Sequence, residues 1–223
     1  MKNLIISVLM MSIWFTSHAQ TSIGLSTGYS TAGLGYVFGE DEKEIQFITV
    51  GLPINFYLSN RFDIRVQPTF IRYGIETHYN IGEPVLGTAT DGIVYYNSIT
   101  TPVELRWKFL NRNKFVASFN VGIGHSYFTN GKIDTDLYMR EIFSDEITME
   151  TIVEDVNFDD PKVSRHSFNG NIGFDIGYKI DDEYMVGLHL NSILGFTGLI
   201  HDASTIKENI RARTVSIQFV KLL

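Results

Sequence analysis

The sequence predicts an all-β protein, built as an eight-stranded antiparallel up-and-down β-barrel that crosses a membrane. Three observations lead to this fold class. Apolar and polar residues alternate with a period of two along much of the chain, which places them on opposite faces of β-strands. Short polar turns alternate with long polar loops, and aromatic residues flank the short turns. A transmembrane barrel combines all three features, because lipid contacts its outer face while its lumen is polar.

The hairpin of residues 93–128 shows the alternation most clearly. Apolar and polar side chains fall on opposite parities of its first strand: Ile99, Val103, Leu105, Trp107 and Phe109 against Ser98, Thr100, Glu104, Arg106 and Lys108. Residues 115–128 repeat the pattern after a short asparagine-containing linker, which suits a hairpin turn. The apolar face is therefore predicted to contact lipid and the charged face to line the lumen.

Six further segments show the same alternation, which brings the predicted count to eight strands. They are residues 21–38, 45–58, 61–73, 163–180, 184–199 and 209–223. Pro53, Pro68 and Pro102 fall inside predicted strands. Because proline has no amide hydrogen to donate, we expect bulges or staggered strand ends at these positions.

The connections predict which end of the barrel faces which side of the membrane. Short turns are expected at residues 59–60, 111–113 and 181–183, and long loops at 39–44, 74–92, 129–162 and 201–208, of which 131–162 is strongly acidic. In this class of barrel the short turns are periplasmic and the long loops extracellular. Nine aromatic residues near the short turns and the last strand's end are predicted to form a girdle: Phe56, Tyr57, Phe62, Trp107, Phe109, Phe115, Tyr178, Tyr184 and Phe219.

Composition excludes several classes of function. The 223 residues include no cysteine, so there is no disulfide, thiolate metal site or cysteine nucleophile. The net charge of −7 argues against nucleic acid as a partner, because such binding depends on basic patches. The mean hydropathy of +0.02 is compatible with a membrane barrel, since alternating strands average to about zero.

The first 19 residues have the order of a secretory signal peptide. Lys2 precedes an apolar core, and Ala19 stands at the position of a small residue before a cleavage site. An uncleaved membrane anchor is the alternative. The predicted organisation is a signal peptide over residues 1–19 and one barrel domain over residues 20–223.

Seven titratable residues on the inward parity form the candidate site. They are Arg65, Glu104, Arg106, Lys108, Asp175, Lys179 and His189. Because eight strands enclose a lumen that side chains nearly fill, we predict a buried network of ion pairs and hydrogen bonds, in which Glu104 pairs with Arg65 or Arg106. A solute path or a catalytic cluster is the alternative.

Other candidate chemistry is weaker. Residues 155–159 are similar to the start of a calcium loop but lack the glycine and glutamate of an EF-hand; a weak divalent-cation site is the alternative to a solvated loop. His125-Ser126 and His166-Ser167 are not dyads, because adjacent strand residues point to opposite faces. We predict no catalytic residue, no cofactor and no metal ligand.

The chain resembles the Bacteroidetes-type outer membrane β-barrel family, PorT-like and OmpA- or OmpX-like in having eight strands. The resemblance rests on ITTPVELRWKF at residues 99–109, on residues 115–124 and 170–178, and on the last strand. It implies residence in the cell outer membrane, with outer-membrane lipid, lipopolysaccharide and the barrel-assembly machinery as partners. Arg211 and Arg213 are candidates for contact with lipopolysaccharide phosphates, with ordinary solvation as the alternative.

From these observations we expect a non-enzymatic role in the envelope. It is either structural or a surface interaction, including support of a secretion or adhesion system through an unknown extracellular or periplasmic protein partner. A lipid-modifying outer-membrane enzyme and a narrow pore are the alternatives.

Overall fold

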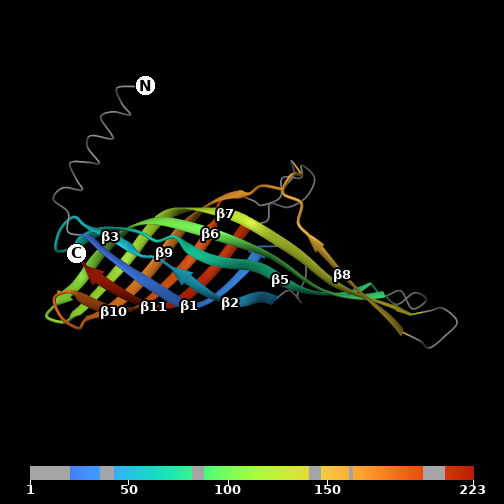
Figure 1. Ribbon diagram of the computed structural model, residues 1–223, viewed down its shortest axis with the longest axis horizontal. Coiled ribbons are helices and arrows are strands. Elements are labelled where there is room, and N and C mark those ends of the chain that lie inside the picture. The colour runs from blue at the N-terminus through green and yellow to red at the C-terminus, as the bar shows by residue number, and fades with distance from the viewer. Residues whose placement is uncertain (1–20, 36–42, 82–87, 141–146, 161–162, 198–208) are drawn as a thin grey trace, which may run out of the picture.

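The computed structural model describes residues 21–35, 43–81, 88–140, 147–160, 163–197 and 209–223. The predicted signal peptide lies outside the described residues. Within these residues, eleven strands form one antiparallel sheet that closes on itself (Figure 1). None of the described residues forms a helix long and apolar enough to cross a membrane.

Eight of the strand positions make the barrel. In order around the ring they are β1 (Thr21–Gly35), β2 with β3 (Lys43–Gly51 and Ile54–Tyr57), β4 with β5 (Phe62–Val66 and Thr69–Ile81), β6 (Thr88–Arg112), β7 (Phe115–Arg140), β9 (His166–Lys179), β10 (Tyr184–Gly195) and β11 (Asn209–Leu222). The ring closes where β1 pairs with β11 from Ser22↔Leu222 to Gly35↔Asn209. This confirms the predicted eight-stranded antiparallel barrel.

Two of the eight positions are interrupted at prolines. β2 stops before Pro53 and β4 stops before Pro68, because neither residue can donate a hydrogen bond to the neighbouring strand. Their carbonyl groups still accept: Gly24 N donates to Pro53 O at 2.9 Å and Leu52 N to Pro68 O at 2.9 Å. Pro102 remains inside β6, opposite Gly124. The breaks therefore leave the ring closed.

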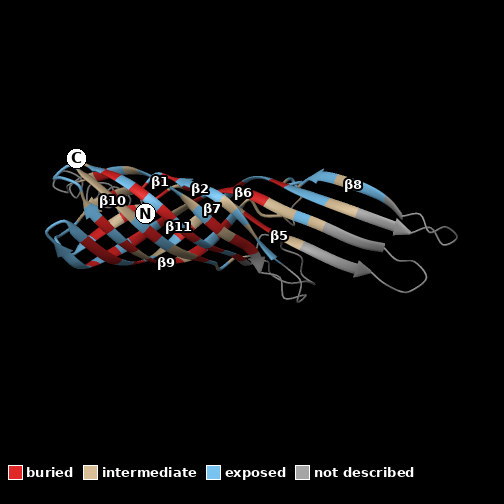
Figure 2. Cartoon of the chain, turned by 90° about the horizontal axis from the view of Figure 1, so that it is seen from below, coloured by how far each residue is buried: buried red, intermediate tan, exposed pale blue. Residues whose placement is uncertain are grey.

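Burial alternates along the barrel strands, as Figure 2 shows. Apolar side chains point outward, including Leu25, Val121 and Ile217 at 57%, 49% and 60% exposure. Polar side chains between them point inward, and Ser26, Asn120 and Ser216 are at most 2% exposed. This inversion of a soluble protein's pattern fits an environment of lipid around the barrel.

The predicted loops 74–92 and 129–162 are partly wrong. β5 continues to Ile81 and β6 begins at Thr88, while β7 continues to Arg140 and is followed by β8 (Ile147–Asp155). Among the described strands, β8 pairs only with β7, outside the ring. About 9–11 residues of strand suffice to cross a bilayer, whereas β6 and β7 have 25 and 26 residues. The surplus projects beyond the barrel as a sheet of β5, β6, β7 and β8 (Figure 2).

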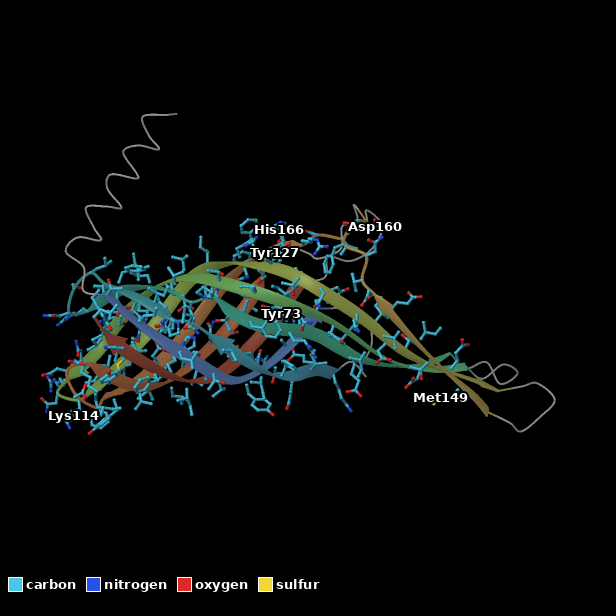
Figure 3. All side chains as sticks on the ribbon, viewed as in Figure 1. Tyr73, Lys114, Tyr127, Met149, Asp160 and His166 are labelled. Atoms are coloured by element: carbon cyan, nitrogen blue, oxygen red, sulfur yellow. The ribbon has the colours of Figure 1, made fainter. Side chains whose placement is uncertain are left out.

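An apolar layer, which the sequence pattern did not predict, fills the loop end of the lumen. Nine buried residues form it: Ala32, Ile71, Tyr73, Ile75, Tyr96, Phe128, Ile193, Ile210 and Ala212. Val156 and Phe158, which follow β8, pack against this layer, and the Phe158 and Tyr96 rings meet edge to face at 6.3 Å. Tyr73 lies between Lys114 at the turn end and Met149 on the projecting sheet (Figure 3).

Candidate functional site in the barrel lumen

Asp175 is the centre of the polar lumen. Both of its carboxylate oxygens accept from Arg65, Nη1 to Oδ1 at 3.2 Å and Nη2 to Oδ2 at 2.8 Å. Arg106 Nε donates to Oδ2 at 3.1 Å, and Ser118 Oγ donates to the same oxygen at 3.0 Å. His189 Nδ1 lies 2.7 Å from Oδ1. A single carboxylate thus joins side chains from β4, β6, β7, β9 and β10.

Asp63 forms a second anionic centre nearer the turn end. It is fully buried, and its Oδ2 lies 2.8 Å from Lys108 Nζ. Arg106 Nη1 lies 3.4 Å from Asp63 Oδ1. Asn55 joins the two centres, since its Oδ1 accepts from Arg65 Nε at 3.2 Å and from Arg106 Nη1 at 2.9 Å.

Strand register explains why these residues meet. Asp63 stands opposite Arg106 and Arg65 opposite Glu104 on β4 and β6, while Asp175 stands opposite His189 on β10. Each residue faces the lumen because it shares the inward parity of its strand. The three cations Arg65, Arg106 and Lys108 are matched by three carboxylates, Asp63, Glu104 and Asp175. Asp63 and Asp175 are both paired and hydrogen-bonded, which is the condition under which buried charges are tolerated.

The structure brings together six of the seven predicted lumen residues: Arg65, Glu104, Arg106, Lys108, Asp175 and His189. Glu104 is only 1% exposed and lies 3.7 Å from Arg65 Nη1, but neither of its oxygens accepts a hydrogen bond from the described residues. Of the two partners predicted for it, Arg65 is therefore the nearer, in a weak ion pair. Lys179 stands apart at the mouth of the barrel, donating to Asn111 Oδ1 at 3.4 Å.

Sequence reasoning missed Asp63 and the bridging role of Asn55. Asp63 shares the parity of Arg65, two residues away, so the period-two rule alone identifies it as inward. Asn55 also shares an inward parity, that of Thr49 and Gly51 on the same strand position, but its contacts depend on the register of three strands.

Most of the predicted aromatic girdle lies on the outer surface at the turn end. Phe62, Trp107, Phe109, Phe115, Tyr178 and Phe219 are between 37% and 55% exposed, and Phe56 and Tyr184 are half-buried. The Trp107 and Phe109 rings are 6.0 Å apart, and Phe115 and Tyr178 are 5.3 Å apart. The girdle prediction is wrong for Tyr57, which lies inside the barrel. Its hydroxyl is 3.1 Å from buried Ser22 Oγ, and its ring centroid is 4.2 Å from Lys108 Nζ.

The described residues leave little free space in the lumen. An open vestibule of about 830 Å³ lies at the turn end, where Tyr57, Lys108 and Lys179 are among its lining residues. Deeper in, two voids of about 10 Å³ each lie beside Asp175 and beside His189. A void of that size holds at most about one water molecule. The vestibule therefore ends at the ionic network.

The other candidate residues form no hydrolytic dyad within the part of the chain that the structure describes. Ser126 points inward and lies 2.8 Å from Thr100 Oγ1, whereas His125 Nε2 lies 2.9 Å from His166 Nδ1 on the outer surface. Asn157 Oδ1 accepts from Asp159 N at 3.0 Å, which makes the calcium-like segment a local turn. No group of three or more His, Asp or Glu side chains among the described residues is placed to hold a metal ion.

No protein-family model and no curated protein matches this sequence. Among solved structures, the attachment invasion locus protein Ail of Yersinia pestis aligns over 90% of this chain and 99% of its own, with 11% identity and a TM-score of 0.42. Neisserial surface protein A aligns over 91% and 97%, with 8% identity and a TM-score of 0.45. The outer membrane protease OmpT of Escherichia coli aligns over 92% and 96%, with 11% identity and a TM-score of 0.41. Likenesses this remote do not assign an activity to this chain.

The class of protein follows from the barrel itself. A closed antiparallel ring leaves no strand edge unpaired across the bilayer, which is the condition for strands to span it. An apolar exterior, a polar interior and aromatic residues at the turn end complete the construction of an outer-membrane β-barrel. The chain is a barrel of that class, located in the cell outer membrane.

Proposed function

We propose that this chain is a non-enzymatic outer-membrane barrel with a sealed lumen, serving the envelope as a structural element or as a surface for contact. One observation carries the proposal: the lumen is closed twice in succession. The charge-balanced network around Asp175 closes it toward the turn end, and the apolar layer around Tyr73 closes it toward the loop end. A solute path requires water-filled space, and ion pairs with hydrogen bonds fill that space here.

The projecting sheet supports a role in surface contact. It presents Asp134, Glu150, Glu154 and Asp155 as exposed acidic side chains, together with exposed Met149 and Val153 at 57% and 56%. With the turn end in the periplasm, as is usual for this class, the sheet stands outside the cell. An extracellular protein partner, in adhesion or in support of secretion, fits this position. The other proposed partners are outer-membrane lipid and lipopolysaccharide, which would surround the barrel, and the barrel-assembly machinery, which would act during insertion. Kinship with the PorT-like barrels is part of the same proposal, supported by residues 99–109.

Conductance in planar bilayers tests the sealed lumen. We expect the folded, inserted protein to give no steady current above the lipid baseline, because the network and the apolar layer exclude ions. Reproducible open-channel steps from the wild-type protein would contradict the proposal and favour a pore. The enzyme alternative is tested separately: lipid A from a deletion strain is expected to have an unchanged mass spectrum, and a missing modification that the gene restores would favour an enzyme.

A further inference from the structure

An arginine on the outer surface is held in place by aromatic rings and an asparagine, and no ion pair of it is found among the described residues. Arg72 on β5 stands opposite Asn97 on β6, two residues beyond the pair Phe70↔Ile99. Phe70 and Ile99 point outward, at 36% and 46% exposure. Arg72 shares the parity of Phe70 and therefore also faces outward.

The height of Arg72 along the barrel can be derived from β6. Ten residues separate outward-facing Trp107, at the turn end, from Asn97. With about 3.3 Å per residue and a tilt of about 45°, that separation spans roughly 23 Å of membrane thickness. The apolar band of such barrels is about 25 Å tall. Arg72 and Asn97 thus lie at the loop-end edge of the apolar band, at the level of lipid headgroups.

Neighbouring side chains fix the orientation of the guanidinium. Its Cζ lies 4.1 Å from the centroid of the Phe47 ring and 4.4 Å from that of Tyr95. Its Nε donates to Asn97 Oδ1 at 2.7 Å, and Asn97 Nδ2 donates in turn to Asn130 Oδ1 at 2.6 Å. Cation–π contacts and a hydrogen bond to Nε hold the planar group and leave one edge for another partner.

That edge, formed by Nη1 and Nη2, is free within the described residues. No hydrogen bond from either nitrogen and no ion pair of Arg72 is found there, in contrast to Arg65, whose Nη1 and Nη2 both donate to Asp175. Two parallel N–H groups on a fixed guanidinium match two oxygens of a phosphate group. The fixed guanidinium edge is thus arranged to donate two hydrogen bonds to one oxyanion.

We propose that Arg72 binds a phosphate group, and that the phosphate belongs to a lipid of the outer leaflet. The lipid source follows from the height of the site at the edge of the apolar band and from the adjacent Phe70, Tyr95 and Ile99, which contact acyl chains and the headgroup boundary. This inference rests on the proposed orientation with the loop end outside the cell. Asn97 is a positioning residue, since it acts through Arg72.

Native mass spectrometry of the folded full-length protein tests the site. The probes are bis-phosphorylated lipid A, its dephosphorylated form, and inorganic phosphate as a competitor. We expect the wild-type protein to retain phosphorylated lipid A about tenfold better than Arg72→Gln does, the loss typical of one charge-assisted pair. Arg72→Lys, which keeps the charge but not the two-pronged edge, is expected to fall between them. Arg61→Gln, which removes the same charge at the turn end, is the matched control and should bind like wild type.

Three results would overturn the proposal: equal retention by wild type and Arg72→Gln, equal retention of dephosphorylated lipid A, or displacement of the lipid by inorganic phosphate at comparable concentration, which would make this a site for soluble phosphate. The gel shift between unheated and boiled samples shows that each variant is folded. Fractionation of cells tests residence in the outer membrane independently, so a failure of the lipid site is distinguishable from a failure of the proposed function.

Discussion

Two buried aspartates balance the inward cations from different heights in the lumen. Asp175 accepts from both arginines, and Asp63 pairs with Lys108 and Arg106. Because these groups are at most 7% exposed, little bulk water is in contact with them to replace a lost partner. Removing one partner of a buried ion pair therefore lowers the free energy of unfolding strongly, because the other charge is left uncompensated.

We expect Asp175→Ala to lower the free energy of unfolding by about 3–5 kcal/mol, because it leaves two buried guanidinium groups uncompensated. Urea unfolding in lipid vesicles measures the change. Glu104→Ala should also destabilise the protein, but by less than Asp175→Ala, since it removes a single ion pair of 3.7 Å and no hydrogen bond between described residues. Asp182→Ala, at the exposed turn, is the control and should have little effect. A larger loss for Glu104→Ala than for Asp175→Ala would contradict this ranking.

The hairpin of β6 and β7 is the longest element pair in the protein. It continues from Thr88↔Met139 to Arg112↔Phe115, with register shifts near Asn97 and Lys108. The turn between the strands is only Asn113 and Lys114, and Asn113 has a positive φ of 49°. Asparagine tolerates this left-handed conformation better than most residues other than glycine, which explains its place in the turn.

Substitutions at Asn113 test the turn. Asn113→Ala should cost about 1 kcal/mol of folding free energy, since Cβ crowds the carbonyl at positive φ and alanine lacks a polar side chain to compensate. Asn113→Gly should be neutral or stabilising. The same urea titration measures both, with Lys114→Ala as the neighbouring control. Equal stabilities for the alanine and glycine variants would show that the backbone here does not require the left-handed conformation.

At the scale of the whole molecule, the protein has a barrel inside the membrane and a sheet beyond it. Figure 1 shows β8 and the ends of β5, β6 and β7 extending from one end only, opposite the short turns. Because the strands extend beyond the barrel at one end only, the protein presents very different surfaces on the two sides of the membrane. The charged network and the apolar layer lie in the barrel, so the projecting sheet and the outer rim are the surfaces that we propose for contact with partners.

An epitope tag tests which end is outside. A tag between residues 143 and 144, in the connection of β7 to β8, should bind antibody on intact cells, because long connections of this class are extracellular. A tag after Asn60, in the turn between β3 and β4, is the matched control and should bind only after the outer membrane is permeabilised. The reverse pattern would invert the orientation and, with it, the exposure of the projecting sheet.

The barrel was predictable from the sequence because its main signal is local. Period-two alternation is a property of a single strand, so lipid-facing Leu105 and lumen-facing Arg106 could each be assigned without knowing any neighbour. Six of the nine girdle residues lie exposed at the turn end for the same reason. Tyr57 was misplaced because its nearness to the turn was given more weight than its parity with Asn55.

The contacts, in contrast, depended on the closed tertiary structure. Asp175 is the centre of the lumen because register brings β4, β6 and β10 around it, and register is a relation between strands that no single strand encodes. β8 was missed because it lies within a strongly acidic segment outside the ring, where only pairing with β7 defines it. Residue order by itself determined which face each barrel side chain takes; closure of the ring decided which side chains meet, since only closure brings distant strands within hydrogen-bond distance.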